Sequence, residues 1–302
     1  MIKYRKIFFI FSGILSIISI ISLFLWGLKF GIDFTGGSLL EVKFTNARIV
    51  SIQEIKEALK NQKLLSLIVQ PVGADSFILR FQQSDEETHQ KVLGDLRNFA
   101  TTKKQNIEEK RYDSIGPVVG AELKTKTLWA VFLSALGIIS YIAWAFRKVS
   151  WPVASWKYGT TAVIALIHDL LIVIGIFSLL GRFFNIEIGV AFVAALMTIL
   201  GYSVHDTIVV FDRIRENLGR SGKETFENIV DGSIKQTLIR SINTSLLTEL
   251  ALIAIFFFGG ETIKDFVLAL IAGIFFGTYS SIFVASALLV EWENWKQRKF
   301  RK

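Results

Sequence analysis

The sequence predicts an α-helical polytopic membrane protein with six transmembrane helices and a small α+β ferredoxin-like extracytoplasmic domain. Of its 302 residues, 52% are hydrophobic and the mean hydropathy is +0.48, which is too apolar for a water-soluble domain of this size. Six apolar runs are long enough to cross a hydrocarbon core of about 30 Å. One polar stretch, residues 30–127, carries strand and helix patterns instead.

Residues 1–29 form the first predicted span. Lys3, Arg5 and Lys6 precede an apolar run over 7–28, which crosses the bilayer core at about 1.5 Å per residue. No cleavage signal of the A-x-A kind follows this run. We therefore expect an anchor helix that is not cleaved.

Residues 30–127 are predicted to fold as a separate domain, because their apolar residues follow the periods of strands and amphipathic helices. The order of elements, β-α-β-β-α-β, is that of the ferredoxin-like motif, in which two helices cover one face of a four-stranded antiparallel sheet. The predicted elements are a strand with Leu40, Val42 and Phe44; a helix opened by a Ser51–Glu54 capping box and burying Ile52, Ile55 and Leu59; strands at 64–70 and 76–82 around a turn at 71–73; a helix capped by Ser84 with Glu87 and carrying Val92, Leu96 and Phe99; and a strand near 105–113.

Residues 128–291 contain the other five predicted spans, at 128–146, 156–180, 187–211, 238–258 and 265–290, and residues 292–302 form a basic tail. Six spans place both termini on one side of the membrane. By the positive-inside rule that side is the cytoplasm, because its segments are rich in basic residues while the short loops opposite carry only Arg182 and Lys264. The basic residues on the cytoplasmic side are Lys3, Arg5, Lys6, Arg147, Lys148, Lys157, Arg213, Arg215, Arg220, Lys223, Lys235, Lys296, Arg298, Lys299, Arg301 and Lys302.

Composition also narrows the classes of function. The net charge of +8 belongs to segments beside apolar runs, so it indicates membrane topology and not nucleic-acid binding. Six tryptophans mark the predicted span ends: Trp129, Trp144, Trp151, Trp156, Trp292 and Trp295. The absence of cysteine rules out disulfides and thiolate ligands, and the three histidines lack a metal-ligand spacing. We therefore expect no metal and no cofactor. We also expect no enzyme activity, because no catalytic constellation or phosphate loop is present.

Ionisable residues inside the predicted spans are the candidate functional residues, since each costs about 2.5–3.5 kcal/mol at the bilayer centre. Asp206 in the fourth span and Arg240 in the fifth lie at similar distances from the same side of the membrane. A nearby arginine favours the charged carboxylate and its removal favours protonation, so relative motion of the two helices could move a proton. The alternatives are a static buried pair, or an Arg240 that only anchors the helix.

The predicted spans contain further ionisable residues, including His205 beside Asp206. His168 and Asp169 lie in the middle of the third span, where they form either a proton relay or a structural pair joined by a hydrogen bond. Glu249, in the fifth span, has no partner that the sequence identifies. It is either a protonated structural residue or a residue that faces another subunit.

The segment GIDFTGG, residues 31–37, directly follows the first span. It lacks the lysine and the glycine spacing of a phosphate loop. We expect Gly31, Gly36 and Gly37 to form a tight turn, with Asp33 and Thr35 capping backbone groups.

Five segments resemble the SecF family: GIDFTGG, VVGAEL ending at residue 123, ALIHDLLI at 165–172, GYSVHDTIVVFDRIREN at 201–217 and QTLIRSINTS at 236–245. The resemblance implies a subunit in the bacterial inner membrane that pairs with SecD and draws on the proton gradient to promote export of preproteins through SecYEG. SecA and YajC are further implied partners. It also implies that Asp206 and Arg240 are the proton-pathway residues and that Asp212 and Arg213 orient the following helix. Glu249 departs from the family pattern and leaves open an additional carboxylate.

Two other functions are compatible with this fold. One is a passive scaffold that holds the export complex together. The other is half of a small-molecule or lipid exporter of the resistance-nodulation-division superfamily, to which SecD and SecF are similar.

Overall fold

The computed structural model describes residues 1–45, 50–73, 75–82, 85–145, 147, 153–220 and 224–300. The chain divides into two compact units, and α5 (Pro117–Ala145) contributes residues to both of them. One unit contains Met1–Lys29 and Trp129–Lys302, and the other contains Phe30–Leu128. Trp151, Lys148, Lys223, Arg301 and Lys302, which support the predicted topology, lie outside the described residues.

Six helical segments among the described residues are long and apolar enough to cross a membrane, as the sequence predicts. They are Ile2–Trp26, Pro117–Ala145, Trp156–Phe184, Val190–Arg220, Phe226–Phe258 and Thr262–Trp295. The helices that contain them are η1 (Ile2–Tyr4) with α1 (Arg5–Trp26), α5, α6 (Ser155–Phe184), α7 (Val190–Arg220), α8 (Phe226–Phe258), and α9 (Glu261–Ser280) continued by the π-helical η3 (Ser281–Ala285) and α10 (Ser286–Phe300).

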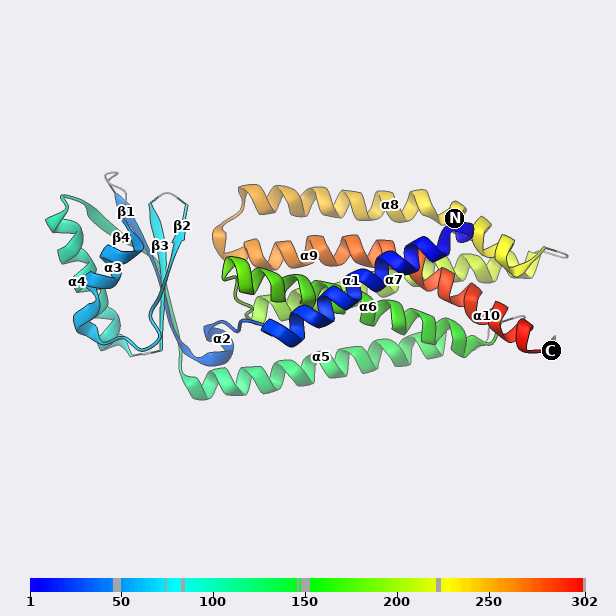
Figure 1. Cartoon of the computed structure of the whole chain (residues 1–302), viewed down its shortest axis with the longest axis horizontal. Helices are drawn as coiled ribbons and strands as arrows, with labels where there is room; N and C mark the ends of the chain where they lie inside the picture. Colours follow the sequence, from blue (N-terminus) through cyan, green and yellow to red (C-terminus); the bar gives the residue numbers. More distant parts are fainter. Residues whose placement is uncertain are drawn as a thin grey trace. The chain divides into compact units, whose positions relative to one another are not determined.

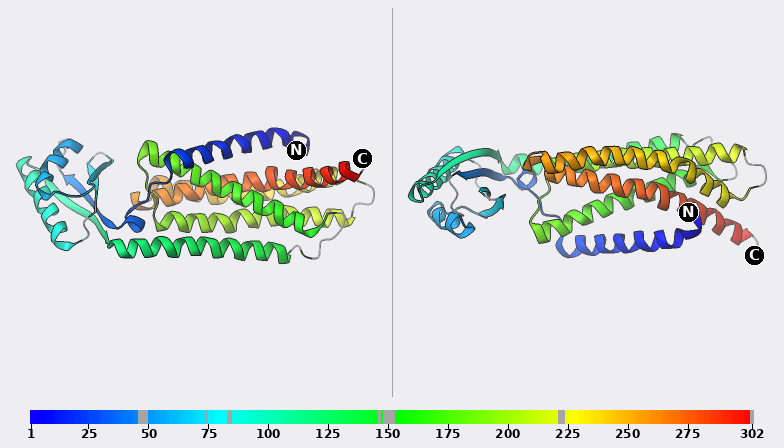
Figure 2. Two further views of the ribbon diagram at one scale, coloured as in Figure 1. Left: turned by 60° about the horizontal axis from the view of Figure 1, so that its bottom comes forward. Right: turned by 90° about the horizontal axis from the view of Figure 1, so that it is seen from above.

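Several helices extend beyond their predicted spans. The sequence predicts that the fourth span ends at residue 211 and that the fifth begins at 238, whereas α7 continues to Arg220 and α8 starts at Phe226. Hydropathy identifies the part of a helix that suits hydrocarbon, while the helix itself continues through polar residues that remain hydrated. The N-terminus and the end of α10 lie at the end of the helical unit where α7 ends and α8 begins (Figure 1, Figure 2).

Small residues allow the helices of this unit to pack closely. A Cβ atom on Gly273 of α9 would lie 2.2 Å from the Ile199 side chain of α7, and one on Gly175 of α6 would lie 2.3 Å from Ser19 of α1. Small side chains at such crossings are typical of membrane helix pairs. The helix α7 is therefore held in the bundle, and half of its apolar 18-residue stretch is buried there.

The second unit has the predicted ferredoxin-like topology. Its elements are α2 (Ile32–Thr35), β1 (Gly37–Thr45), α3 (Ile52–Ala58), η2 (Lys60–Gln62), β2 (Ile68–Val72), β3 (Ser76–Phe81), α4 (Glu86–Thr102) and β4 (Asn106–Ile115). The sheet order is β2-β3-β1-β4 and each neighbouring pair is antiparallel. Leu40, Val42 and Phe44 are buried, because alternate residues of β1 point to the same face of the sheet.

Three local predictions for this unit are wrong. Pro71 lies within β2, which an edge strand tolerates, and the turn comes later, with Gly73 at φ +69°. Ile52 is 37% exposed, because as the first residue of α3 it has no preceding helical turn beside it. The N-cap of α4 is Asp85, whose Oδ1 accepts a hydrogen bond from the Thr88 amide at 2.8 Å, while Ser84 lies outside the described residues.

The capping box of α3 is confirmed and predicts a local dependence on pH. Hydrogen bonds from Lys103 and from Ser51 lower the pKa of Glu54 from 4.5 to about 2. The stabilisation is therefore present above the unfolded-state pKa of 4.5 and is lost as pH falls towards 2. We expect hydrogen exchange at the amides of Ser51 and Glu54, corrected for intrinsic rates, to rise over this range. Glu54→Gln should flatten that rise, and an unchanged pH dependence would contradict the assignment.

Candidate functional site

Asp206 on α7 is held in the helical unit by a serine of α8. Its side chain is 7% exposed, and its Oδ1 accepts a hydrogen bond from the Ser241 hydroxyl at 2.8 Å. The other carboxylate oxygen, Oδ2, is buried and has no hydrogen-bond partner among the described residues. Buried polar atoms are nearly always paired, so an oxygen without a partner marks a place where a proton or a water molecule can bind.

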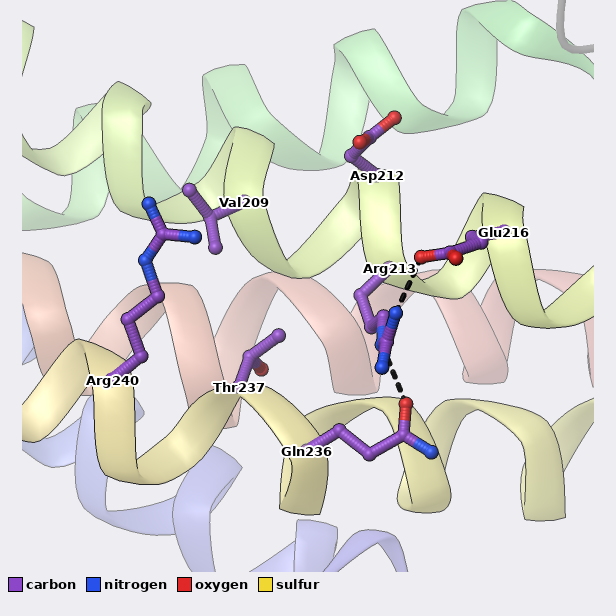
Figure 3. A pocket seen from close by; sticks show the side chains of 7 residues that line it. All are labelled: Val209, Asp212, Arg213, Glu216, Gln236, Thr237 and Arg240. Carbon is purple, nitrogen blue, oxygen red and sulfur yellow. Dashed lines mark hydrogen bonds and ion pairs between the residues drawn. The ribbon is translucent and has the colours of Figure 1, made fainter.

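Arg240 directly precedes Ser241 on α8 but forms no ion pair with Asp206 among the described residues. Neighbouring residues of a helix point about 100° apart, and Ser241 occupies the position that faces Asp206. The Arg240 side chain instead extends beside Val209 into an open pocket between α7 and α8 (Figure 3). The two residues predicted to act together therefore lie on neighbouring helices, with no hydrogen bond or ion pair between them among the described residues.

Asp169 is the centre of a second buried polar cluster, which joins three helices. Its side chain is 0% exposed. Its Oδ2 accepts hydrogen bonds from Ser203 of α7 at 2.6 Å and from Ser280 of α9 at 2.7 Å, and its Oδ1 lies 3.0 Å from Nδ1 of His168. Sequence reasoning identified the carboxylate and the histidine but missed the two serines, whose hydroxyls are individually unremarkable in apolar helices.

The π-helical segment η3 begins directly after Ser280. The Ser281 hydroxyl lies 2.7 Å from that of Thr207 and donates to the Ser203 carbonyl at 3.2 Å, while Ser286 donates to the Ser281 carbonyl at 3.3 Å. Segments of π-helix are rare and are often found at functional sites. Here Ser280 bonds to α6 and Ser281 bonds to α7.

Glu249 belongs to neither cluster. Its side chain is partly buried on α8, and it forms no hydrogen bond or ion pair among the described residues. The helix α8, which carries Glu249, is largely exposed: 11% of its apolar 18-residue stretch is buried. Within the described part of the chain, Glu249 therefore shares no hydrogen bond with the clusters around Asp206 and Asp169.

The GIDFTGG segment forms the tight turn that the sequence predicts. Gly36 and Gly37 have φ angles of +72° and +122°, and the Thr35 hydroxyl donates to the Gly31 carbonyl at 3.0 Å. A Cβ atom on Gly36 would lie 2.6 Å from the Cα atom of Pro117. This turn therefore packs directly against the start of α5.

Replacing Gly36 by alanine should destabilise the second unit by about 2 kcal/mol or more, because it combines a left-handed backbone angle with a backbone clash. Gly94→Ala is the matched control. Gly94 lies within α4 and an added Cβ meets no atom within 4 Å, so alanine should stabilise the helix by up to about 1 kcal/mol. Hydrogen exchange of β1 and β4 in the full chain measures both changes. Equal effects of the two substitutions would contradict the packing argument.

Within the described part of the chain, no group of three or more His, Asp or Glu residues is placed to hold a metal ion. The chemistry that this arrangement can perform is proton binding at buried carboxylates.

Comparisons with known proteins identify the family. The family described as protein export membrane protein SecD/SecF, C-terminal, matches residues 96–295, and the SecD/SecF GG motif matches residues 21–47. The chain is 45% identical to protein translocase subunit SecF of Thermobaculum terrenum, covering 97% of this chain and 93% of the relative. It is 40% identical to protein translocase subunit SecF of Anaerolinea thermophila, covering 97% and 96%.

Solved structures agree with this match. The crystal structure of SecDF, a translocon-associated membrane protein from Thermus, is 32% identical with a TM-score of 0.82 over 97% of this chain. A super-membrane-facing form of SecDF is 32% identical with a TM-score of 0.69 over 99% of it. The chain spans 38% and 39% of those two longer chains. With the family match over residues 96–295 and the near full-length relatives, this multi-pass membrane protein belongs to the SecF family.

Proposed function

We propose that this chain is an auxiliary subunit of the Sec protein translocase that pairs with SecD and uses the proton gradient to promote export of preproteins through SecYEG. In this assignment both termini and the tail at 292–302 are cytoplasmic, residues 30–127 are extracytoplasmic, and the membrane is the bacterial inner membrane. SecA and YajC are the other expected partners. The names of the relatives support the translocase role.

The observation that carries the proton-coupled part of the proposal is the environment of Asp206. A charged carboxylate within a membrane-spanning helix costs free energy, and such residues usually have a function. Asp206 has one oxygen held by Ser241 and one buried oxygen with no hydrogen-bond partner among the described residues, so it can gain or lose a proton while its side chain stays in place. A membrane potential contributes about 2.3 kcal/mol per charge per 100 mV, so one proton per cycle could supply useful work.

The experiment compares export of a secreted preprotein into inverted membrane vesicles with and without this chain, at equal SecYEG and SecA. We expect the increment due to this chain to disappear when a protonophore dissipates the gradient. A passive scaffold would retain its increment without the gradient. A small-molecule or lipid exporter would show no preprotein-dependent increment under either condition.

A further inference from the structure

The sixth span is interrupted by the π-helical segment η3, which lies between α9 and α10. A single π-helical turn contains one residue more than the α-helical turn that it replaces. Its two sides therefore differ in register by one residue, which is a rotation of about 100° and a rise of about 1.5 Å. The Ser286 hydroxyl donates to the Ser281 carbonyl, five positions earlier, at 3.3 Å. Removing the extra residue would join α9 and α10 as one continuous α-helix.

The α9 side of η3 is fixed against α7 by two glycines. A Cβ atom on Gly273 would lie 2.2 Å from the Ile199 side chain, and one on Gly277 would lie 3.1 Å from the side chain of Ser203. Rotation of α9 would bring larger side chains to these close contacts, so the helix keeps its orientation.

The α10 side of η3 is fixed by two ion pairs. Nζ of Lys157 on α6 lies 2.7 Å from Oε2 of Glu293, and both side chains are buried. Nε of Arg5 on α1 lies 2.5 Å from Oε1 of Glu291. Separating a buried ion pair is strongly destabilising, so α10 also keeps its orientation. Between two fixed helices, the extra residue can change its place only by moving along the span.

Two consecutive serines at the start of η3 bond to different helices. Ser280 donates to Oδ2 of Asp169 on α6 at 2.7 Å, and the Ser281 hydroxyl lies 2.7 Å from that of Thr207 on α7. Both serine side chains are 0% exposed. If the extra residue moves to the α9 side of these serines, each residue that it passes takes the place of the one before it. Ser281 then donates to Asp169, and Ile282 lies beside Thr207.

We propose that the sixth span has two registers, and that Ser280 and Ser281 alternate as the hydrogen-bond donor to Asp169. The buried carboxylate keeps this bond in both registers, so the two are close in free energy. They differ at Thr207, which has a hydroxyl beside it in one register and an apolar side chain in the other. Thr207 directly follows Asp206, so the movement changes the packing beside the candidate proton site. Its role in export rests on the proposed function, whereas the two registers do not.

Serine substitutions test whether the donors alternate. Ser280→Ala removes the observed donor, which the second register replaces with Ser281. Ser203→Ala is the matched control, because Ser203 donates to the same oxygen of Asp169 at 2.6 Å from α7, which has no second register. We expect Ser280→Ala to lower the unfolding temperature of the purified chain less than half as much as Ser203→Ala. The double variant Ser280→Ala/Ser281→Ala should lose more than the sum of the single losses. Equal losses from the two single variants, or an additive double variant, would overturn the alternation.

Single-residue deletions hold the span in one register. Deletion of Ile282 removes the extra residue in the observed register, and deletion of Ser280 removes it in the second. Deletion of Ile274 is the matched control: Ile274 is as buried as Ile282, at 3% and 2% exposure, but lies within α9. Its loss moves Thr278 into the place of Gly277, which packs against α7. We therefore expect the chain without Ile282 to resist unfolding better than the chain without Ile274.

Hydrogen exchange measures the movement itself, because moving the extra residue breaks backbone hydrogen bonds of η3. In the full chain with its partner subunits, we expect the amides of residues 283–286 to exchange at least about tenfold more slowly when Ile282 is deleted. Exchange as fast as in the native chain would overturn the two registers. So would a chain without Ile282 that unfolds as readily as the chain without Ile274.

Export of a preprotein into inverted vesicles then tests the role of the movement. Chains without Ile282 or without Ser280 should lose the gradient-dependent increment while they are present in the membrane in native amounts. A full increment from either chain would overturn the role of the movement in export. Because unfolding and exchange are measured without export, a native chain whose export does not depend on the gradient would overturn the proposed function and leave the two registers to be decided by those measurements.

Discussion

Replacing Asp206 by asparagine is expected to abolish the gradient-dependent part of preprotein export while leaving the fold intact. Asparagine has nearly the same shape, and its oxygen can still accept the hydrogen bond from Ser241. Its amide nitrogen, however, cannot take up or release a proton near neutral pH. The measurement is export into inverted vesicles with and without a protonophore, at equal amounts of native and variant chain. The increment due to the variant should fall to the level of vesicles that lack the chain.

Ser241→Ala separates proton binding from the positioning of the carboxylate. This variant retains the titrating group but removes its hydrogen-bond donor, so it should retain a reduced gradient-dependent increment. The dependence of that increment on cytoplasmic pH should also shift, which loss of folding alone would not cause. Full activity of Asp206→Asn would contradict the proton role of Asp206 and would favour the passive scaffold.

Replacing Asp169 by alanine is expected to produce the largest loss of stability among the ionisable residues of the spans. The substitution removes the shared partner of the Ser203 and Ser280 hydroxyls and of the His168 ring, and all three side chains are buried. Ser280 retains a second acceptor, the Gly277 carbonyl at 3.1 Å. Each buried polar group left unsatisfied costs about 1–3 kcal/mol, so we expect a total of about 3–5 kcal/mol, as for other broken buried networks. Resistance to unfolding in detergent, measured on the purified chain, reports the change.

Asp169→Asn should instead be nearly neutral for stability. Its oxygen can accept from both serines, and its amide can donate to Nδ1 of His168 in the tautomer that carries the proton on Nε2. This variant also distinguishes the two roles left open by the sequence, because a proton relay would lose gradient-dependent export and a structural pair would retain it. Glu249→Ala is the control for burial. Glu249 has no hydrogen-bond or ion-pair partner in the described part of the chain, so this substitution should change stability by less than about 1 kcal/mol. A destabilisation equal to that of Asp169→Ala would contradict the network account.

The sequence was sufficient for those features that follow from hydropathy and periodicity along the chain. Six long apolar runs need a hydrocarbon environment, so the six spanning helices are confirmed. Alternating apolar residues in β1 and the Ser51–Glu54 capping box likewise specify a strand and a helix start, and the ferredoxin-like sheet order follows from the order of the elements. The cost of charge in a membrane was enough to single out Asp206 and Asp169 as candidates.

The tertiary structure alone decided which side chains these carboxylates meet. Ser241, not its neighbour Arg240, contacts Asp206, because a rotation of about 100° between consecutive helical residues determines which one faces α7. Ser203 and Ser280 meet at Asp169 from helices separated by more than 70 residues of sequence, and the π-helical segment follows at Ser281. Such partners depend on how helices rotate and cross when they pack, and hydropathy contains no information about that rotation. The sequence therefore determined which ionisable residues lie in the membrane. Packing determined which of them are bonded, and which carboxylate oxygen has no partner among the described residues.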